Sequence, residues 1–266
     1  MIDGALSLFE RLVAGDLLIG AEASSASAGA VEIMGGLSFD VMIVDTRHAA
    51  LSPYSDELER LLRAADLSNT PALVRVAENT PGTINRAMND GAAGIVAAVG
   101  DVEAAARAAK SVRYPPRGFR GAAPVVRAAR FGLTPWDDYR EATNAARPVV
   151  ASIETAEALE AAPSIAAVDG VDVILLDIMN LSLALNTPLR ALERHDAIGT
   201  ALRRLRASDR VVGVNLPSPE GAEVWRDAGC TLLIVGTDVA AYSAATAALR
   251  ADLDAVPTRL AEDKRP

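Results

Sequence analysis

Polar residues with catalytic chemistry follow short apolar runs at several places in the chain. The clearest are Arg47 and His48 after "FDVMIVDT", Arg75 within "PALVRV" and Glu154 in "ASIET". An arginine inside an apolar run needs an anion, which is either Glu154, as a structural pair, or the carboxylate of a substrate. A base, two cations and a carboxylate suit a reaction in which negative charge develops on an oxygen atom, with or without a metal ion.

Later apolar runs also end in polar residues: Asp177 and Asn180 in "LLDIMNLS", Asn215 in "VVGVNL" and Asp238 in "VGTD". Structural roles stay open for some of these side chains. His48 could cap the helix that follows it, and Asp177 could cap a loop. We expect His195, in the charged stretch "LERHDA", at the surface, and Cys230 in the core.

The elements that position these residues are eight short apolar runs, most of them continuous rather than alternating. They are residues 16–23, 39–46, 71–76, 93–99, 147–154, 171–177, 210–216 and 231–236. Continuous apolar runs are typical of parallel strands covered by helices, and amphipathic helical patterns separate them here. Eight such repeats predict a (β/α)8 TIM barrel, whose active site forms at the carboxyl ends of the strands. A doubly wound open sheet is the alternative, but "LIGAEASSASAG" lacks the G-x-G-x-x-G spacing of its usual first turn.

Three segments depart from the repeat. Residues 5–16 predict a helix that caps the bottom of the barrel. Residues 113–146, rich in Arg, Gly and Pro, form an insertion that either covers the site as a lid or makes a subunit contact. The charged residues 256–266 predict a loose C-terminal tail after a single barrel domain spanning residues 1–255.

The composition excludes several classes of function. Half of the 266 residues are hydrophobic and the formal net charge is −9, which argues against nucleic acid and anionic membranes as partners. There is no apolar stretch of membrane-spanning length, and the N-terminus lacks the basic region of a signal peptide, so we expect a cytoplasmic protein. The single Cys230 excludes an internal disulfide and a cysteine-cluster metal site.

The order of these motifs resembles the HpcH/HpaI family of pyruvate aldolases, within the phosphoenolpyruvate/pyruvate barrel superfamily. That group includes 2,4-dihydroxyhept-2-enedioate and 2-keto-3-deoxy-sugar-acid aldolases, with the citrate lyase β and macrophomate synthase branches. "RYPPRGFRG" (113–121) is close to the family's "YPPxGxRG", and "FDVMIVDTRHAALS" (39–52) is similar to its "FDxxxIDxEHxxxs". "PALVRV", "RAMNDGAAGIVAAV", "ASIET", "LLDIMNLSLAL" and "VGTD" follow in the family's order, so the resemblance covers about residues 4–250.

The resemblance implies a carbon–carbon lyase that acts on a 2-oxo acid through a pyruvate enolate. By motif, His48 is the base, Arg75 the enolate stabiliser and Glu154 a ligand of a divalent Mg or Mn ion; no organic cofactor is expected. The substrate carboxylate would meet Met179, Asn180 and Ser182. The relatives assemble as hexamers, trimers of dimers that exchange the last helix, so a homo-oligomer is expected.

Several positions depart from the family's pattern at the chemistry. The glutamate of "DxEH" is Arg47, the aspartate of "LDxGA" is Asn89, and the metal aspartate before "LS" is Asn180, with Asp177 three residues earlier. Three hypotheses follow. Asp177 replaces the missing metal ligand; or Arg47 and Arg75 take over the role of the cation in a metal-independent lyase; or the chain is an inactive barrel that serves as a binding or scaffold protein.

Overall fold

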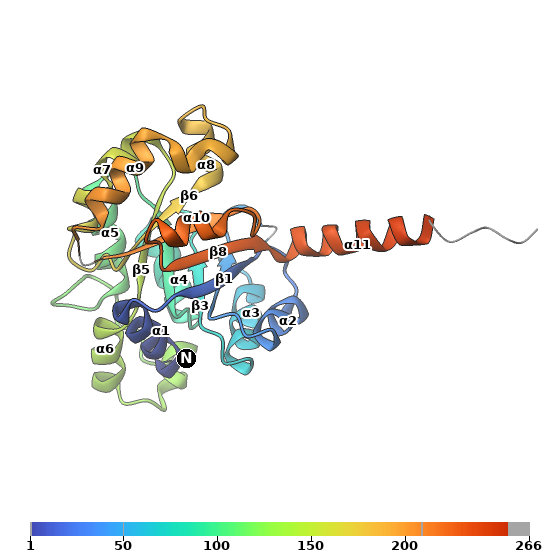
Figure 1. Ribbon diagram of the computed structural model, residues 1–266. Helices are drawn as coiled ribbons and strands as arrows, with labels where there is room; N and C mark the ends of the chain where they lie inside the picture. The colour runs from blue at the N-terminus through green and yellow to red at the C-terminus, as the bar shows by residue number, and fades with distance from the viewer. Residues whose placement is uncertain (1, 50, 209, 255–266) are drawn as a thin grey trace, which may run out of the picture.

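The computed structural model describes residues 2–49, 51–208 and 210–254, and they form a closed barrel of parallel strands in the order β1 to β8 (Figure 1). The strands are β1 Leu18–Ala23, β2 Val41–Asp45, β3 Ala72–Arg75, β4 Gly94–Ala98, β5 Val149–Ile153, β6 Val173–Asp177, β7 Val211–Leu216 and β8 Leu232–Thr237. The prediction of a (β/α)8 TIM barrel with an N-terminal helix is therefore confirmed.

Helices alternate with these strands. They are α1 Ile2–Ala14, α2 Ala28–Gly36, α3 Asp56–Leu67, α4 Pro81–Asn89, α5 Val102–Val112, α6 Trp136–Ala145, α7 Ala156–Ala166, α8 Ile178–Ala184, α9 Asp196–Leu205, α10 Ala222–Asp227 and α11 Asp238–Asp254, with 3-10 turns η1 Arg127–Gly132 and η2 Leu189–Arg194. Several helices are capped by the residue that precedes them. The side-chain oxygens of Ser27, Thr80 and Asp101 accept backbone N–H groups from the first turns of α2, α4 and α5.

The interior of the barrel has an apolar lower tier, which helix α1 closes from below. Ala5, Leu8 and Leu12 of α1 pack against strand side chains such as Ile43 and Leu73, all almost fully buried. The predicted capping helix is thus at its expected place. Close packing in this tier requires a glycine at residue 20, because a Cβ there would lie 2.6 Å from the backbone oxygen of Val41.

The insertion of residues 113–146 lies on the lower side of the barrel, so the predicted lid is wrong. It begins where α5 ends and leads into the start of β5, because α5 has already carried the chain down from the mouth. Its helix α6 contacts α1 (Figure 1). The ring of Tyr114 packs edge to face with those of Trp136 and Tyr139 in it, and the centroids of Tyr114 and Trp136 are 5.0 Å apart. A subunit contact here stays a prediction.

Helix α11 extends away from the barrel (Figure 1), and its main contacts with other elements are to β1 and β8. Its residues 239–253 are exposed, among them Val239, Tyr242, Leu249 and Leu253. None of the helices within the described ranges has the length and apolarity that crossing a bilayer requires. The expected tail of residues 256–266 lies outside the described residues, and the single-domain assignment stays a prediction.

Candidate active site

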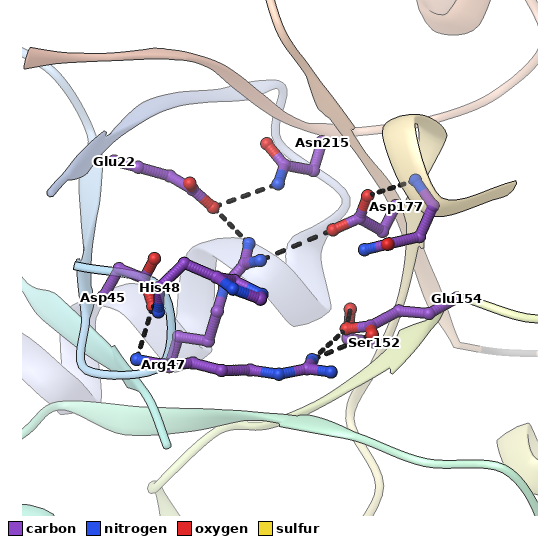
Figure 2. A network of polar contacts seen from close by, with 10 residues as sticks. Glu22, Asp45, Arg47, His48, Ser152, Glu154, Asp177 and Asn215 are labelled. Atoms are coloured by element: carbon purple, nitrogen blue, oxygen red, sulfur yellow. Dashed lines mark hydrogen bonds and ion pairs between the residues drawn. The ribbon is translucent and has the colours of Figure 1, made fainter. Parts of the chain in front are cut away.

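The inward-facing positions of the strands change from apolar to polar at the carboxyl end of the barrel. In β2 the series is Val41, Ile43 and then Asp45, since alternate residues of a strand face the same side. The same spacing leads from Leu18 to Glu22 in β1 and from Leu73 to Arg75 in β3. We call the six charged residues gathered at this end the rim network (Figure 2): Glu22, Asp45, Arg47, Arg75, Glu154 and Asp177.

Arg75 is 4% exposed and lies between two carboxylates. Its Nη2 donates to Oε1 of Glu22, and its Nη1 lies 3.4 Å from Oδ2 of Asp177. Its Nε is buried and has no hydrogen-bond partner among the described residues. The suggested pair between Arg75 and Glu154 is not formed, because Glu22 and Asp177 hold the guanidinium.

Glu22 is a rim residue that the sequence reasoning missed. It is 7% exposed, and besides Arg75 it accepts a hydrogen bond of 3.0 Å from Nδ2 of Asn215. Burial raises the pKa of Glu22 to about 7; Arg75 opposes the rise, whereas Asp45 and Asp177 add to it. The signal was a carboxylate within "LLIGAEA" at the same strand parity as Leu18.

Arg47 is paired with Glu154 across the barrel mouth (Figure 2). Its Nη1 lies 2.7 and 2.8 Å from the two carboxylate oxygens of Glu154. The hydroxyl of Ser152 donates to Oε1 of the same carboxylate at 3.1 Å. The guanidinium of Arg47 thus occupies both oxygens of the carboxylate that the resemblance made a metal ligand.

The turn after β2 presents His48 to solvent. Oδ1 of the buried Asp45 accepts the backbone N–H groups of Arg47 and His48, at 2.8 and 3.2 Å. The backbone therefore fixes where both side chains leave the strand, while the His48 side chain stays exposed. An exposed imidazole beside a rim of charged groups is accessible to a bound substrate.

Helix α8 begins directly at the end of β6. Oδ1 of Asp177 accepts the backbone N–H of Asn180 at 3.1 Å, so this amide, predicted to meet a substrate carboxylate, is already bonded. Met179 is 49% exposed, and Asn180 is half-buried. The hydroxyl of Ser182 donates to the carbonyl of Thr187, which directs it to the end of its own helix.

The candidate metal ligands do not fit a divalent cation as they are arranged. Glu154 is bound through both oxygens to a guanidinium, Asp177 caps α8 and faces Arg75, and Asn180 supplies an uncharged amide. Magnesium and manganese prefer several anionic oxygens. Among the residues that the structure describes, no group of three or more His, Cys, Asp or Glu side chains is arranged to hold a metal ion.

The other candidates do not belong to the rim network. Asn89 ends α4, where its side-chain oxygen accepts from Arg120 at 2.7 Å. His195 caps α9 through Nδ1, and Cys230 is buried as expected, with the pKa of its thiol raised by burial to about 12. Asp238 holds the start of the β1–α2 loop, accepting the two backbone N–H groups of residues 24 and 25 at 2.8 and 3.2 Å.

A closed parallel barrel with charged side chains gathered at the carboxyl ends of its strands is the architecture of barrel enzymes that act on small polar molecules. The sequence profile of the HpcH/HpaI aldolase/citrate lyase family matches residues 22–245, and the chain belongs to that family.

Aldolases of keto-deoxy acids are among its relatives. The chain is 32% identical over 220 residues to the 2-dehydro-3,6-dideoxy-6-sulfogluconate aldolase of Pseudomonas putida, covering 81% of this chain and 84% of the relative. It is 30% identical over 238 residues to the 2-keto-3-deoxy-L-rhamnonate aldolase of Escherichia coli K12, with 88% of each chain covered. A crystal structure of an HpcH/HpaI family protein from Burkholderia cenocepacia J2315 superposes with a TM-score of 0.84 at 28% identity, covering 94% of this chain and 100% of the other.

Proposed function

We propose that this chain is a carbon–carbon lyase of the aldolase type that acts on a 2-oxo acid through an enolate-like intermediate. The observation that carries the proposal is the convergence of two guanidinium groups, Arg47 and Arg75, with His48 at the mouth of an aldolase-family barrel. Guanidinium N–H groups stabilise the negative charge that develops on the 2-oxo oxygen as the bond breaks.

The residues divide the work of a retro-aldol cleavage. His48 takes the proton of the C4 hydroxyl, directly or through a water molecule, as the C3–C4 bond breaks and an aldehyde leaves. The electron pair of that bond forms the enolate, whose oxygen faces the guanidinium of Arg75. Transfer of that proton from His48 to C3, directly or through a water molecule, then gives the 2-oxo acid product and restores the base.

A metal-independent version of this reaction is favoured by the pair between Arg47 and Glu154. The guanidinium of Arg47 binds the carboxylate of Glu154, to which the family pattern assigns a metal cation. It supplies positive charge there without needing further anionic ligands. Positive charge from Arg47 and Arg75 together orients an anionic substrate, while Met179 and Asn180 line the edge of the mouth.

The experiment measures release of a 2-oxo acid from 4-hydroxy-2-oxo acids and from 2-oxo dioic acids, in EDTA and with added Mg²⁺ or Mn²⁺. We expect turnover that survives EDTA and is lost in Arg75→Ala. Arg63→Ala is the matched control, because Arg63 forms an exposed pair with Glu59 on α3. Absence of turnover with every substrate of both classes would instead favour the inactive binding or scaffold protein.

We further propose a homo-oligomer. The exposed apolar side chains of α11 lie on a helix that extends away from its own barrel, and such a surface is normally covered by another chain. Sedimentation velocity of the full chain and of a chain ending before α11 tests this, with a monomeric full chain as the contrary result.

A further inference from the structure

The rim network carries more negative than positive charge. Its four carboxylates and two guanidinium groups leave a formal charge of −2 when all are ionised and His48 is neutral. A 2-oxo acid is itself an anion, so it enters a site whose cations already have anionic partners. Binding therefore needs a carboxylate to move away from an arginine or to take up a proton.

Three of the four carboxylates accept hydrogen bonds that their negative charge strengthens. Asp45 accepts two backbone N–H groups of the turn after β2, and Asp177 accepts the first-turn N–H of α8. Glu154 accepts Arg47 through both oxygens. Protonating any of them would weaken the start of a loop or helix, or a two-point ion pair.

Glu22 differs from these three carboxylates, because it caps no loop or helix and does not bind an arginine through both oxygens. Its hydrogen-bond partners among the described residues are two side-chain groups, Nη2 of Arg75 and Nδ2 of Asn215, both on the same oxygen, Oε1. It is buried on β1 beside the guanidinium that faces the substrate, and the Nε of Arg75 is a buried donor without a partner among the described residues. A proton on Oε2 would remove the charge and leave Oε1 free to accept both hydrogen bonds.

We propose that Glu22 is the titratable counter-ion of Arg75, and that it takes up a proton when a carboxylate or enolate oxygen of a 2-oxo acid binds the guanidinium. The inference rests on the proposed function and names a positioning residue for it. One proton moves from solvent to Glu22 as one anion binds, and no other bond changes. Arg75 then exchanges one anionic partner for another.

The groups that face Glu22 act in opposite directions. Arg75 on β3 and the amide of Asn215 on β7 favour its carboxylate, whereas Asp45 on β2 and Asp177 on β6 disfavour it. Burial is the largest influence, and it raises the pKa of Glu22 to about 7. Protonated Glu22 therefore becomes scarce as the pH rises through neutrality, and anion affinity should fall with it.

Isothermal titration with oxalate, a dianion shaped like an enolate of pyruvate, tests the proposal. The apparent Kd scales inversely with the fraction of protein that has Glu22 protonated, so oxalate should bind about tenfold more weakly at pH 8 than at pH 6. Titrations in buffers of different ionisation enthalpy should show proton uptake that approaches one per oxalate at the higher pH.

The variant Glu22→Gln keeps a side-chain oxygen for Arg75 and Asn215 but cannot ionise. We expect it to bind oxalate at every pH as tightly as the unchanged chain does at low pH, without the uptake. Glu59→Gln, in an exposed pair on α3, is the matched control and should behave as the unchanged chain.

The outcomes separate the two proposals. Oxalate binding whose pH dependence and proton uptake persist in Glu22→Gln overturns the role of Glu22 and assigns the proton elsewhere, for example to His48. Failure of oxalate to bind the unchanged chain at any pH overturns the 2-oxo acid site, and the role of Glu22 with it. The uptake measured on the unchanged chain stands even if the variant folds poorly, and its absence there also refutes the proposal.

Discussion

Replacing Arg47 should show whether its guanidinium occupies the place of a cation. The side chains of Arg47 and Glu154 are 29% and 11% exposed, between a surface pair and a buried one. Two unit charges about 4 Å apart attract by about 4 kcal/mol at an effective dielectric constant of 20. Desolvation and the ordering of the arginine offset most of this, so we expect Arg47→Gln to cost about 1–2 kcal/mol.

The variant Arg47→Glu should be less stable still, because it sets a second carboxylate against Glu154, and it should gain a metal response. The loss of about 1–2 kcal/mol of unfolding free energy expected for Arg47→Gln lowers the Tm of a chain of this size by about 4 °C, and Arg47→Glu should melt lower than that. The two carboxylates of Arg47→Glu offer anionic oxygens, and a cation at a hundredfold excess over its Kd restores about 2.7 kcal/mol.

Thermal melts with and without millimolar MnCl₂ measure both effects. Only Arg47→Glu should be stabilised by the metal, whereas Arg47→Gln and the exposed control Arg63→Gln should not respond. If the unchanged chain is stabilised by MnCl₂ as much as Arg47→Glu, the guanidinium does not exclude the metal and the reasoning fails.

Three further predictions concern stability. The pKa of Glu22 is raised to about 7 in the folded chain, so the folded state binds more protons than the unfolded state between its ordinary pKa and neutrality. Stability should fall as the pH rises through this window, and Glu22→Gln should gain up to about 3 kcal/mol over the unchanged chain at pH 8 but little at pH 4, by urea unfolding; equal gains at both pH values would contradict it. Gly20→Ala should cost about 1–3 kcal/mol by the same measurement, because its Cβ would lie 2.6 Å from a backbone oxygen; Gly36→Ala, where a Cβ meets nothing within 4 Å, is the control. Asp238→Ala should speed hydrogen exchange of the amides of residues 24 and 25, which its carboxylate accepts, while Asp138→Ala should leave them unchanged; unaltered exchange in Asp238→Ala would show that other groups order this loop.

The sequence predicted the fold and the meeting of rim residues because strand parity and strand ends are periodic features. Arg75 and Glu154 were placed correctly at the mouth, since each continues the inward-facing parity of its strand, after Leu73 in β3 and after Val150 in β5. The partner of each was not predictable, because pairing across a barrel depends on side-chain reach between strands distant in sequence. Glu22 was missed for a related reason: one acidic residue in an apolar run gives no sign of which arginine it faces.

The error about residues 113–146 has a different cause. The segment comes after β4 in the sequence, which suggested the mouth of the barrel, but helix α5 first returns the chain to the lower side. Barrel loops alternate between the two faces, so a segment that follows a helix lies on the face opposite the catalytic one, where it cannot cover the site.

The two-tier interior of the barrel has a consequence for how such a protein can evolve. The apolar floor, closed by Leu8 and Leu12 of α1, is separate from the charged rim above it. Substitutions at the rim, such as an arginine at residue 47, change the charge seen by a substrate without touching the side chains of this apolar floor. A chain of this design can therefore exchange one means of holding an anion for another through single substitutions, while each intermediate sequence still folds.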